Sequence, residues 1–169
     1  FVVVEAKHNL IYNRHHIVYN YISTESVLIV DDDIVLNEQI IHELIKTWTI
    51  FKNNVIGVCG RSYDIFGNYY YYDKIGNTTM TIGQTMMYHK KYMLEFAKHE
   101  ILHEIVNDDL VFQIMVHSLN SNNCSMIINT NGDIKRLDDT GALSSIPNWT
   151  QLRSQSIRFA LRYFSKKHI

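Results

Sequence analysis

The chain has few of the residues and patterns that define several protein classes. One proline among 169 residues, with 46% hydrophobic residues, excludes a proline-rich disordered chain. Two cysteines, Cys59 and Cys124, are too few for a disulfide framework. No apolar run approaches the roughly 18 residues of a transmembrane helix. A net charge of −1 gives no electrostatic indication of nucleic acid or of an anionic membrane. We therefore expect a globular protein, with one domain over residues 1–169.

The beginning of the chain predicts that more sequence precedes it. The first residue is Phe1, inside the apolar run Phe1–Val4, so any signal peptide or anchor is expected outside this chain. Three glycosylation sequons, at Asn77, Asn123 and Asn148, are compatible with a secretory location.

Hydrophobic periodicity predicts alternating strands and helices. Apolar runs predict strands at residues 1–5, 27–30, 55–59, 69–75, 79–88 and 125–129, with a turn at Gly76-Asn77. Helical spacing follows the N-cap residue Asn37 up to Asn53-Asn54, continues over residues 90–117 with a break near Asn107, and returns at 149–165. Residues 6–26 and 130–148 are expected as loops. This alternation favours an α/β sandwich, in which ligands bind at the carboxyl ends of the strands.

Three consecutive aspartates, Asp31, Asp32 and Asp33, stand at such a strand end. Neighbouring carboxylates repel one another, by about 1 kcal/mol in water for a pair about 4 Å apart and about 4 kcal/mol at an effective dielectric near 20. A hard divalent cation such as Mg²⁺ or Mn²⁺ relieves that repulsion. The alternative is a solvated turn, because Asp is common in turns.

A second acidic pair, Asp108-Asp109, opens another helical run. Acids in the first turn of a helix are ordinary, because the helix dipole favours them. A catalytic carboxylate fixed at a rigid helix start is the other interpretation. The isolated arginines Arg14, Arg61 and Arg153 become informative if a phosphate is to be bound, since the guanidinium group binds it bidentately.

The segment His99–His103 spells the H-E-x-x-H signature of zinc proteases. The spacing to Asp109 imitates a third ligand, but that extended pattern needs glycine at position 106, where Val106 stands. A surface helix with its His and Glu side chains in water explains the segment more simply.

Taken in order, seven segments resemble the exostosin-type glycosyltransferases, glycosyltransferase family 64. Asn9–Arg14 is similar to the family's N-x-L-x-N-R segment, Thr24–Asp33 to its strand TEAVLSLDDD, and Ile56–Arg61 to VGFxxR. The other matching segments are a helix carrying Trp48, residues 79–92 with Gly83 and His89, Asn107–Leu110, and Ser144-Ser145 followed by Trp149–Arg153.

The resemblance implies a GT-A-type fold, with a mixed central sheet flanked by helices. It implies Mn²⁺-dependent (or Mg²⁺-dependent) transfer of an N-acetylhexosamine from a UDP-sugar to a glycan or glycoconjugate acceptor, with retention, in the Golgi or endoplasmic reticulum lumen. Asp33 is then the metal ligand. Asp109 and Arg153 are the catalytic residues, and the substrate contacts are Asn9, Arg14, Asp31, Asp32, Asp108 and Arg61. No nucleic acid is expected, and membrane association is expected only through a segment outside this chain.

The chain also departs from the family pattern. The family commonly has cysteines at the positions of Asn107 and Ser156, which the resemblance implies are a disulfide pair, and both are absent here. The family has Asn where Val106 stands, and His where Trp149 stands, which affects acceptor contacts. The upstream unit that holds uracil in this fold is missing from the chain.

Those departures leave two alternative functions open. One is a degenerate glycosyltransferase-like domain that binds a glycan or a partner without catalysis. The other is metal-dependent phosphoryl transfer, in which both acidic clusters hold metals about 4 Å apart.

Overall fold

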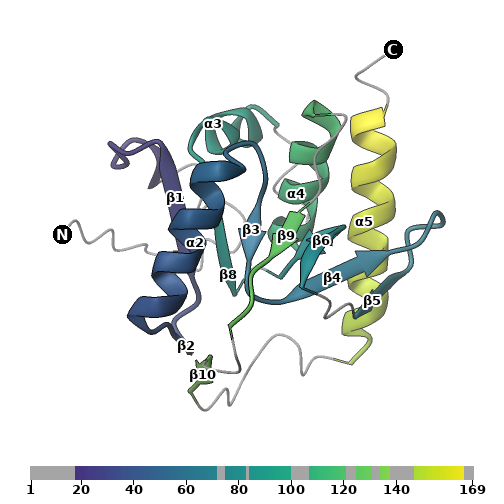
Figure 1. The fold of residues 1–169 in the computed structure, drawn as a ribbon. Helices are drawn as coiled ribbons and strands as arrows, with labels where there is room; N and C mark the ends of the chain where they lie inside the picture. Colours follow the sequence, from purple (N-terminus) through teal and green to yellow (C-terminus); the bar gives the residue numbers. More distant parts are fainter. Residues whose placement is uncertain are drawn as a thin grey trace.

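A computed structural model describes residues 18–71, 75–82, 84–99, 107–120, 125–130, 134–137 and 147–165. The strand expected at residues 1–5 lies outside these ranges, as do Asn9 and Arg14. Figure 1 shows the elements, which in chain order are β1 (Ser26–Val30), β2 (Ile34–Val35), α2 (Glu38–Ile50), β3 (Ile56–Gly57), β4 (Gly60–Tyr63), β5 (Tyr69–Tyr71), β6 (Gly76–Thr78), β7 (Met80–Thr81), β8 (Thr85–His89), α3 (Lys91–Ala97), α4 (Asp108–Leu119), β9 (Ser125–Ile127), β10 (Lys135–Arg136) and α5 (Trp149–Ser165).

The central sheet of the described residues has five strands in the order β1-β8-β3-β9-β6. It is mixed, because β8 is antiparallel to both β1 and β3, whereas β3 and β9 are parallel. A second sheet, β5-β4-β7, and a two-stranded ribbon, β10-β2, adjoin it. The mixed α/β architecture expected from the sequence is confirmed.

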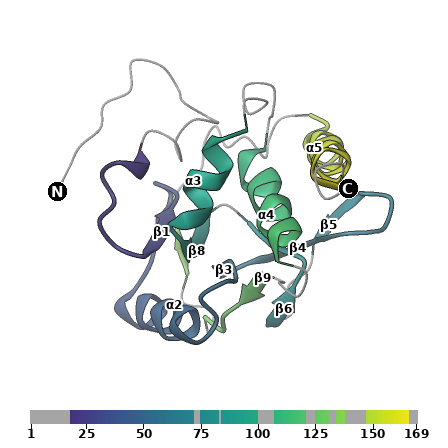
Figure 2. The same ribbon diagram turned by 90° about the horizontal axis from the view of Figure 1, so that it is seen from above.

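Helices cover both faces of this sheet, as Figure 2 shows from above, with α2 on one side and α3, α4 and α5 on the other. Between α2 and the sheet, Ile40, Leu44 and Trp48 pack in one core with residues of β3 and β8. A larger core on the opposite face contains Tyr88 and Phe112, whose rings lie 4.6 Å apart.

The carboxyl ends of three strands meet at one edge of the sheet. Strands β1 and β3 run in the same direction because both are antiparallel to β8, and β9 is parallel to β3. The aspartate triplet follows the end of β1 directly, so it lies at this edge. Ligand sites of α/β sheets are found at such edges.

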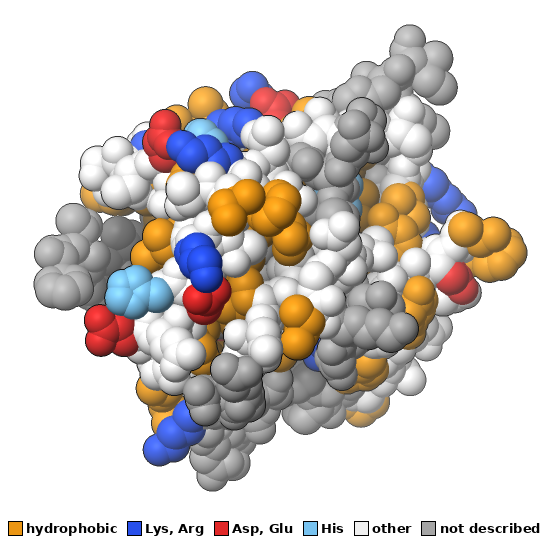
Figure 3. All heavy atoms as spheres, in the orientation of Figure 1, with side chains coloured by type: hydrophobic (Ala, Val, Ile, Leu, Met, Phe, Trp, Pro, Cys, Tyr) orange, Lys and Arg blue, Asp and Glu red, His pale blue; other side chains and the backbone are white. Residues whose placement is uncertain are grey.

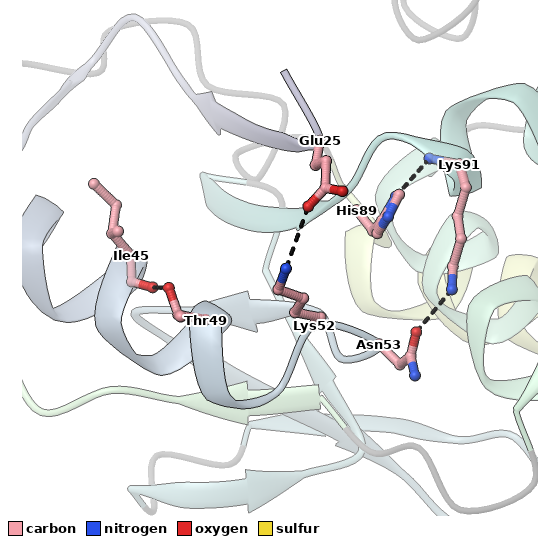
Figure 4. A network of polar contacts seen from close by, with 7 residues as sticks. All are labelled: Glu25, Ile45, Thr49, Lys52, Asn53, His89 and Lys91. Atoms are coloured by element: carbon pink, nitrogen blue, oxygen red, sulfur yellow. Dashed lines mark hydrogen bonds and ion pairs between the residues drawn. The ribbon is translucent and has the colours of Figure 1, made fainter.

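The opposite edge carries an unrelated polar network, drawn in Figure 4. Lys52 Nζ lies 3.3 Å from a carboxylate oxygen of Glu25, and Lys91 Nζ donates to Asn53 Oδ1 at 2.7 Å. His89 Nδ1 accepts from the backbone N–H of Lys91 at 3.0 Å. Burial lowers the pKa of His89, and the nearby Lys91 and Lys52 charges lower it further. These exposed contacts contribute about 0–1 kcal/mol each and lie away from the triplet.

Several local expectations were wrong. Gly76-Asn77 is not a turn but the start of β6, which pairs with β9, and Gly76 has φ +99°. The strand expected over residues 79–88 is two strands in different sheets, β7 and β8. The strand expected at 55–59 is shorter, and β4 begins immediately after it at Gly60. The loop expected over 130–148 contains β10.

Candidate functional site

The backbone of the aspartate triplet is fixed on both sides. Asp31 N–H donates to Gln84 C=O at 2.9 Å, just before β8, and Leu137 N–H donates to Asp33 C=O at 2.7 Å, just after β10. Asp31 and Asp33 are half-buried, and Asp32 is exposed. The triplet therefore forms a turn that backbone hydrogen bonds fix at this edge of the sheet, and its three side chains differ in exposure.

The triplet offers a partial set of metal ligands. Among the residues that the structure describes, no three His, Cys, Asp or Glu side chains are grouped closely enough to hold an ion by themselves. Half-buried carboxylates next to an exposed one are hard oxygen donors, which suit Mg²⁺ or Mn²⁺. These residues fit an ion that takes its remaining ligands from a substrate's oxygens and from water, as Mg²⁺ commonly does in phosphate sites.

The second acidic pair is buried, unlike ordinary acids of a first helical turn. Asp108 is 6% exposed and Asp109 is 7% exposed, at the amino end of α4. The Asp109 N–H donates to Asp108 Oδ1 at 2.9 Å, so Asp108 takes part in closing the helix start. Burial of ionisable groups is costly unless they are paired or hydrogen-bonded, which marks this helix end as specialised.

One fully buried amide fixes α4 to the sheet. Gln113 Oε1 accepts from the Thr81 N–H at 2.7 Å, and Gln113 Nε2 donates to the Thr81 carbonyl at 2.7 Å. The same Nε2 contacts the Asp109 carbonyl at 3.1 Å. Gln113 therefore pairs with β7 as a neighbouring strand would, and it holds the start of α4 beside β7.

The short segment from β7 to β8 connects the two acidic groups. At its beginning, Thr81 binds Gln113 and thereby the start of α4, and at its end Gln84 binds Asp31. Thr81 also pairs with Gly60 of β4, next to Arg61. A Cβ on Gly57 would lie 2.6 Å from Thr81 Cβ, so only glycine allows β3 to pack this closely against the segment.

Two of the predicted arginines lie around one buried tyrosine. Arg153 Nη1 donates to the Tyr69 hydroxyl, and the Arg153 guanidinium carbon lies 5.0 Å from the Tyr69 ring centroid and 4.9 Å from that of Trp149. Arg61 is buried over the Tyr71 ring, at 4.3 Å. Burial raises the pKa of Tyr69, and the charges of Arg153 and Arg61 oppose that rise.

This arginine cluster can bind an anion. Arg153 Nε is buried and has no hydrogen-bond partner among the described residues. A buried guanidinium N–H without a partner is costly, and an anionic oxygen would satisfy it.

Tyr69 was missed by the reasoning from sequence. It belongs to the run Tyr69–Tyr72, which is indistinguishable from a compositional excess of tyrosine. Its backbone N–H donates to Ser154 Oγ at 3.0 Å, which fixes β5 to α5. The contacts that separate Tyr69 from its neighbours are long-range contacts with Ser154 and Arg153, so the sequence carries no local signal for it.

The first residue of the H-E-x-x-H segment, His99, does not lie on a surface helix. Helix α3 ends at Ala97, and His99 lies beyond it, buried against the Tyr163 and Phe164 rings at 5.6 Å and 5.1 Å. The expectation that His99 faces water was wrong. Glu100 and His103 lie outside the described residues.

The two positions at which the family has cysteines are neighbours in space. Asn107 Nδ2 donates to Ser156 Oγ at 3.3 Å, and both residues are buried. A hydrogen bond between α4 and α5 thus occupies the place where the resemblance implies a bridge.

Comparison with known families gives one match. The model of the glycosyl transferase family 64 domain matches residues 1–166, nearly the whole chain. No curated protein matches the chain. None of the helices in the described ranges is long and apolar enough to cross a membrane.

Proposed function

Because the chain belongs to glycosyltransferase family 64, we propose that it transfers an N-acetylhexosamine from a UDP-sugar to a glycan or glycoconjugate acceptor, with retention and with Mn²⁺. The family makes the chain a glycosyltransferase, with a sugar donor and a glycan acceptor. The proposal adds the GT-A-type fold, the donor, the stereochemistry, the metal, and a place in the Golgi or endoplasmic reticulum lumen.

The observation that carries the proposal is that three groups are each linked to the same short segment, from β7 to β8. The triplet is bonded to Gln84, the start of α4 is bonded through Gln113 to Thr81, and Arg61 stands next to the residue that pairs with Thr81. These groups suit metal-dependent transfer from a nucleotide sugar, with carboxylates for a metal, a cation for the departing diphosphate, and a carboxylate for the sugar.

In the proposed reaction, Asp33 would hold the metal, and Asp31 and Asp32 would contact the metal's surroundings and the ribose. The ion supplies positive charge that stabilises the departing diphosphate without proton transfer. Arg153 and Arg61 bind the diphosphate oxygens as charge develops on them. Asn9 and Arg14, outside the described residues, are proposed to contact the nucleotide or the diphosphate.

Asp109 is proposed to act on the sugar. As the diphosphate departs, the anomeric carbon gains oxocarbenium character, which a carboxylate stabilises or attacks. Asp109 lies at the start of a helix, and its backbone carbonyl accepts a hydrogen bond from Gln113 Nε2. Both features give Asp109 the rigid position that such a role requires. Asp108 is proposed to contact the donor from the same turn.

The test is Asp109→Asn. We expect Mn²⁺-dependent hydrolysis of UDP-N-acetylhexosamine, and transfer to an acceptor, to fall at least about a hundredfold, because the charge facing the sugar is lost. Binding of UDP with Mn²⁺, measured by calorimetry, should remain. Glu38→Gln is the matched control, since Glu38 is also a first-turn acid but exposed, on α2.

Two outcomes would contradict the proposal. Turnover retained in Asp109→Asn would remove Asp109 from the reaction. A folded wild-type chain that binds UDP with Mn²⁺ but turns over no donor would favour the degenerate, binding-only alternative.

A further inference from the structure

The tip of the β4–β5 hairpin exposes two large apolar side chains. Ile65 is 91% exposed and Phe66 is 71% exposed, more than any other large hydrophobic residue in the described ranges. Figure 3 shows hydrophobic side chains protruding at the right edge of the molecule, where Figure 1 shows this hairpin. Contiguous exposed apolar groups commonly mark an interaction site.

The turn that presents these side chains is tightly hydrogen-bonded. Asp64 Oδ1 accepts from the backbone N–H groups of Phe66 and Asn68, both at 2.9 Å, and Asp64 Oδ2 accepts from Asn68 Nδ2 at 2.8 Å. Gly67 N–H donates to the Asp64 carbonyl at 2.9 Å. These bonds lower the pKa of Asp64. The exposed conformation of the tip is thus determined by its own residues, without a partner.

Helix α5 fixes the hairpin from outside. Arg158 Nε donates to the Phe66 carbonyl at 3.1 Å, and Arg158 Nη2 donates to Asn68 Oδ1. Gly67 has φ +75°, and a Cβ there would lie 2.7 Å from Arg158 Cγ. The tip therefore projects as a rigid part of the fold, and Ile65 and Phe66 remain exposed beside the residues that the structure describes.

The surroundings of the tip combine aromatic and basic side chains with one acid, Asp64, whose carboxylate is hydrogen-bonded within the turn. Tyr70 and Tyr71 of β5 are exposed, and Phe159 and Arg162 of α5 are exposed on the same helix as Arg158. Tyrosines that expose both a ring and a hydroxyl suit the boundary between lipid and water. Arginines attract anionic headgroups.

We propose that this hairpin inserts Ile65 and Phe66 into the surface of a lipid bilayer that contains anionic lipid. The tip projects from the molecule, and a lipid bilayer can accommodate projecting side chains without a preformed groove, whereas a protein partner needs one. Its two side chains offer roughly 300 Å², well below the about 800 Å² per partner that a stable protein interface buries. Since Tyr69 begins β5 three residues after Phe66, the attachment holds the arginine cluster close to the membrane. The inference goes beyond the proposed function and does not depend on it, and it replaces the expectation that membrane association occurs only through a segment outside this chain.

The experiment is co-sedimentation of the 169-residue chain with phosphatidylcholine vesicles, with and without phosphatidylserine. We expect binding to the vesicles that contain phosphatidylserine, and at least about a tenfold lower partition coefficient for Ile65→Ser/Phe66→Ser. Arg162→Gln should lower binding to the anionic vesicles about fivefold and leave binding to neutral vesicles unchanged.

The chain offers a matched control. Ile50 and Phe51 form a second exposed Ile-Phe pair, at 67% and 41%, at the end of α2. Ile50→Ser/Phe51→Ser should bind vesicles as the wild type does. Circular dichroism checks that every variant is folded.

The other results overturn the proposal. Binding that is unchanged in Ile65→Ser/Phe66→Ser, or reduced equally in the control pair, excludes the tip as the anchor. A wild-type chain that binds neither vesicle also overturns it. If that chain instead self-associates in sedimentation velocity, and Ile65→Ser/Phe66→Ser abolishes the association, the tip is a contact between copies of the protein.

Discussion

At the scale of single residues, a network of buried polar side chains links the centre of α4 to the sheet. Ser125 Oγ donates to Gln113 Oε1 at 2.9 Å, and His117 Nε2 lies 3.2 Å from the same Ser125 Oγ. Gln113 and Ser125 are fully buried. Satisfied buried networks of this kind fix one packing arrangement, because each member left without its partner is costly. The position of Asp109 one turn earlier depends on this network.

His117 gives this network a pH dependence. Burial lowers the pKa of His117 to about 4, against about 6.5 in an unfolded chain. Between these values the unfolded chain binds more protons than the folded one, so stability should fall as the pH falls from about 6.5 to about 4. The loss approaches about 3 kcal/mol. Urea unfolding over this pH range measures it.

The matched variants are His117→Gln and His42→Gln. His117→Gln should remove most of the loss between pH 6.5 and 4, whatever it does to stability at neutral pH. His42 is exposed on α2, so His42→Gln should leave the pH dependence as in the wild type. An unchanged slope in His117→Gln would assign the acid sensitivity to other groups.

At the scale of elements, the contact between α4 and α5 can be strengthened. Asn107 and Ser156 already touch, at 3.3 Å between side-chain atoms, at positions where the resemblance implies cysteines. Asn107→Cys/Ser156→Cys should therefore form a disulfide in the folded chain under oxidising conditions. The bridge should stabilise the fold by about 2–4 kcal/mol, because it constrains the unfolded chain.

Thiol titration and thermal unfolding with and without reductant measure this effect. Ser156→Cys alone is the control, and its stability should not depend on reductant. If the double variant keeps free thiols under oxidation while folded, the two side chains do not approach in the geometry that a disulfide needs.

Elements with local signals were predicted well. Helix α2 begins where Asn37 accepts a hydrogen bond from Ile40 N–H at 2.9 Å, and the predicted apolar residues Ile40, Leu44 and Trp48 are buried. The start of α4 after Asn107 was likewise predicted. By contrast, residues 79–88 were predicted as one strand, and their division into β7 and β8 depends on Gln113 and β4 binding Thr81. The partners that place β7 in a different sheet lie far away in sequence.

At the scale of the whole molecule, the charged groups of the candidate site could be predicted from the sequence, but the residues that connect them could not. The triplet, Asp109 and Arg153 stand out as charges at element ends. Tyr69, which contacts Arg153, and Gln113, which contacts Asp109, are uncharged residues whose partners lie far away in sequence, at Arg153 and Thr81. Long-range pairing of this kind follows from topology and is not expressed in the local pattern. The structure therefore adds the uncharged residues that hold the site together.

The proposed donor site should make global stability depend on ligand. A ligand that binds only the folded chain, at about a hundredfold above its Kd, adds about 2.7 kcal/mol. For a chain of this size, that raises Tm by roughly 5–10 °C. We expect UDP with Mn²⁺ to produce such a shift in thermal unfolding, and UDP with a chelator to produce a much smaller one, because the proposed ion would be held by the triplet and would supply positive charge to the diphosphate.

Asp33→Asn should abolish the Mn²⁺-dependent part of the shift, because it removes the ligand charge at the half-buried end of the triplet. Glu38→Gln, an exposed acid five residues later, should keep the shift in full. An equal shift in Asp33→Asn and the wild type would place the ion elsewhere. Binding is measured here without turnover, so this result separates the metal site from catalysis. A chain with the full shift but no transferase activity would retain the nucleotide site, and it would favour the binding-only alternative.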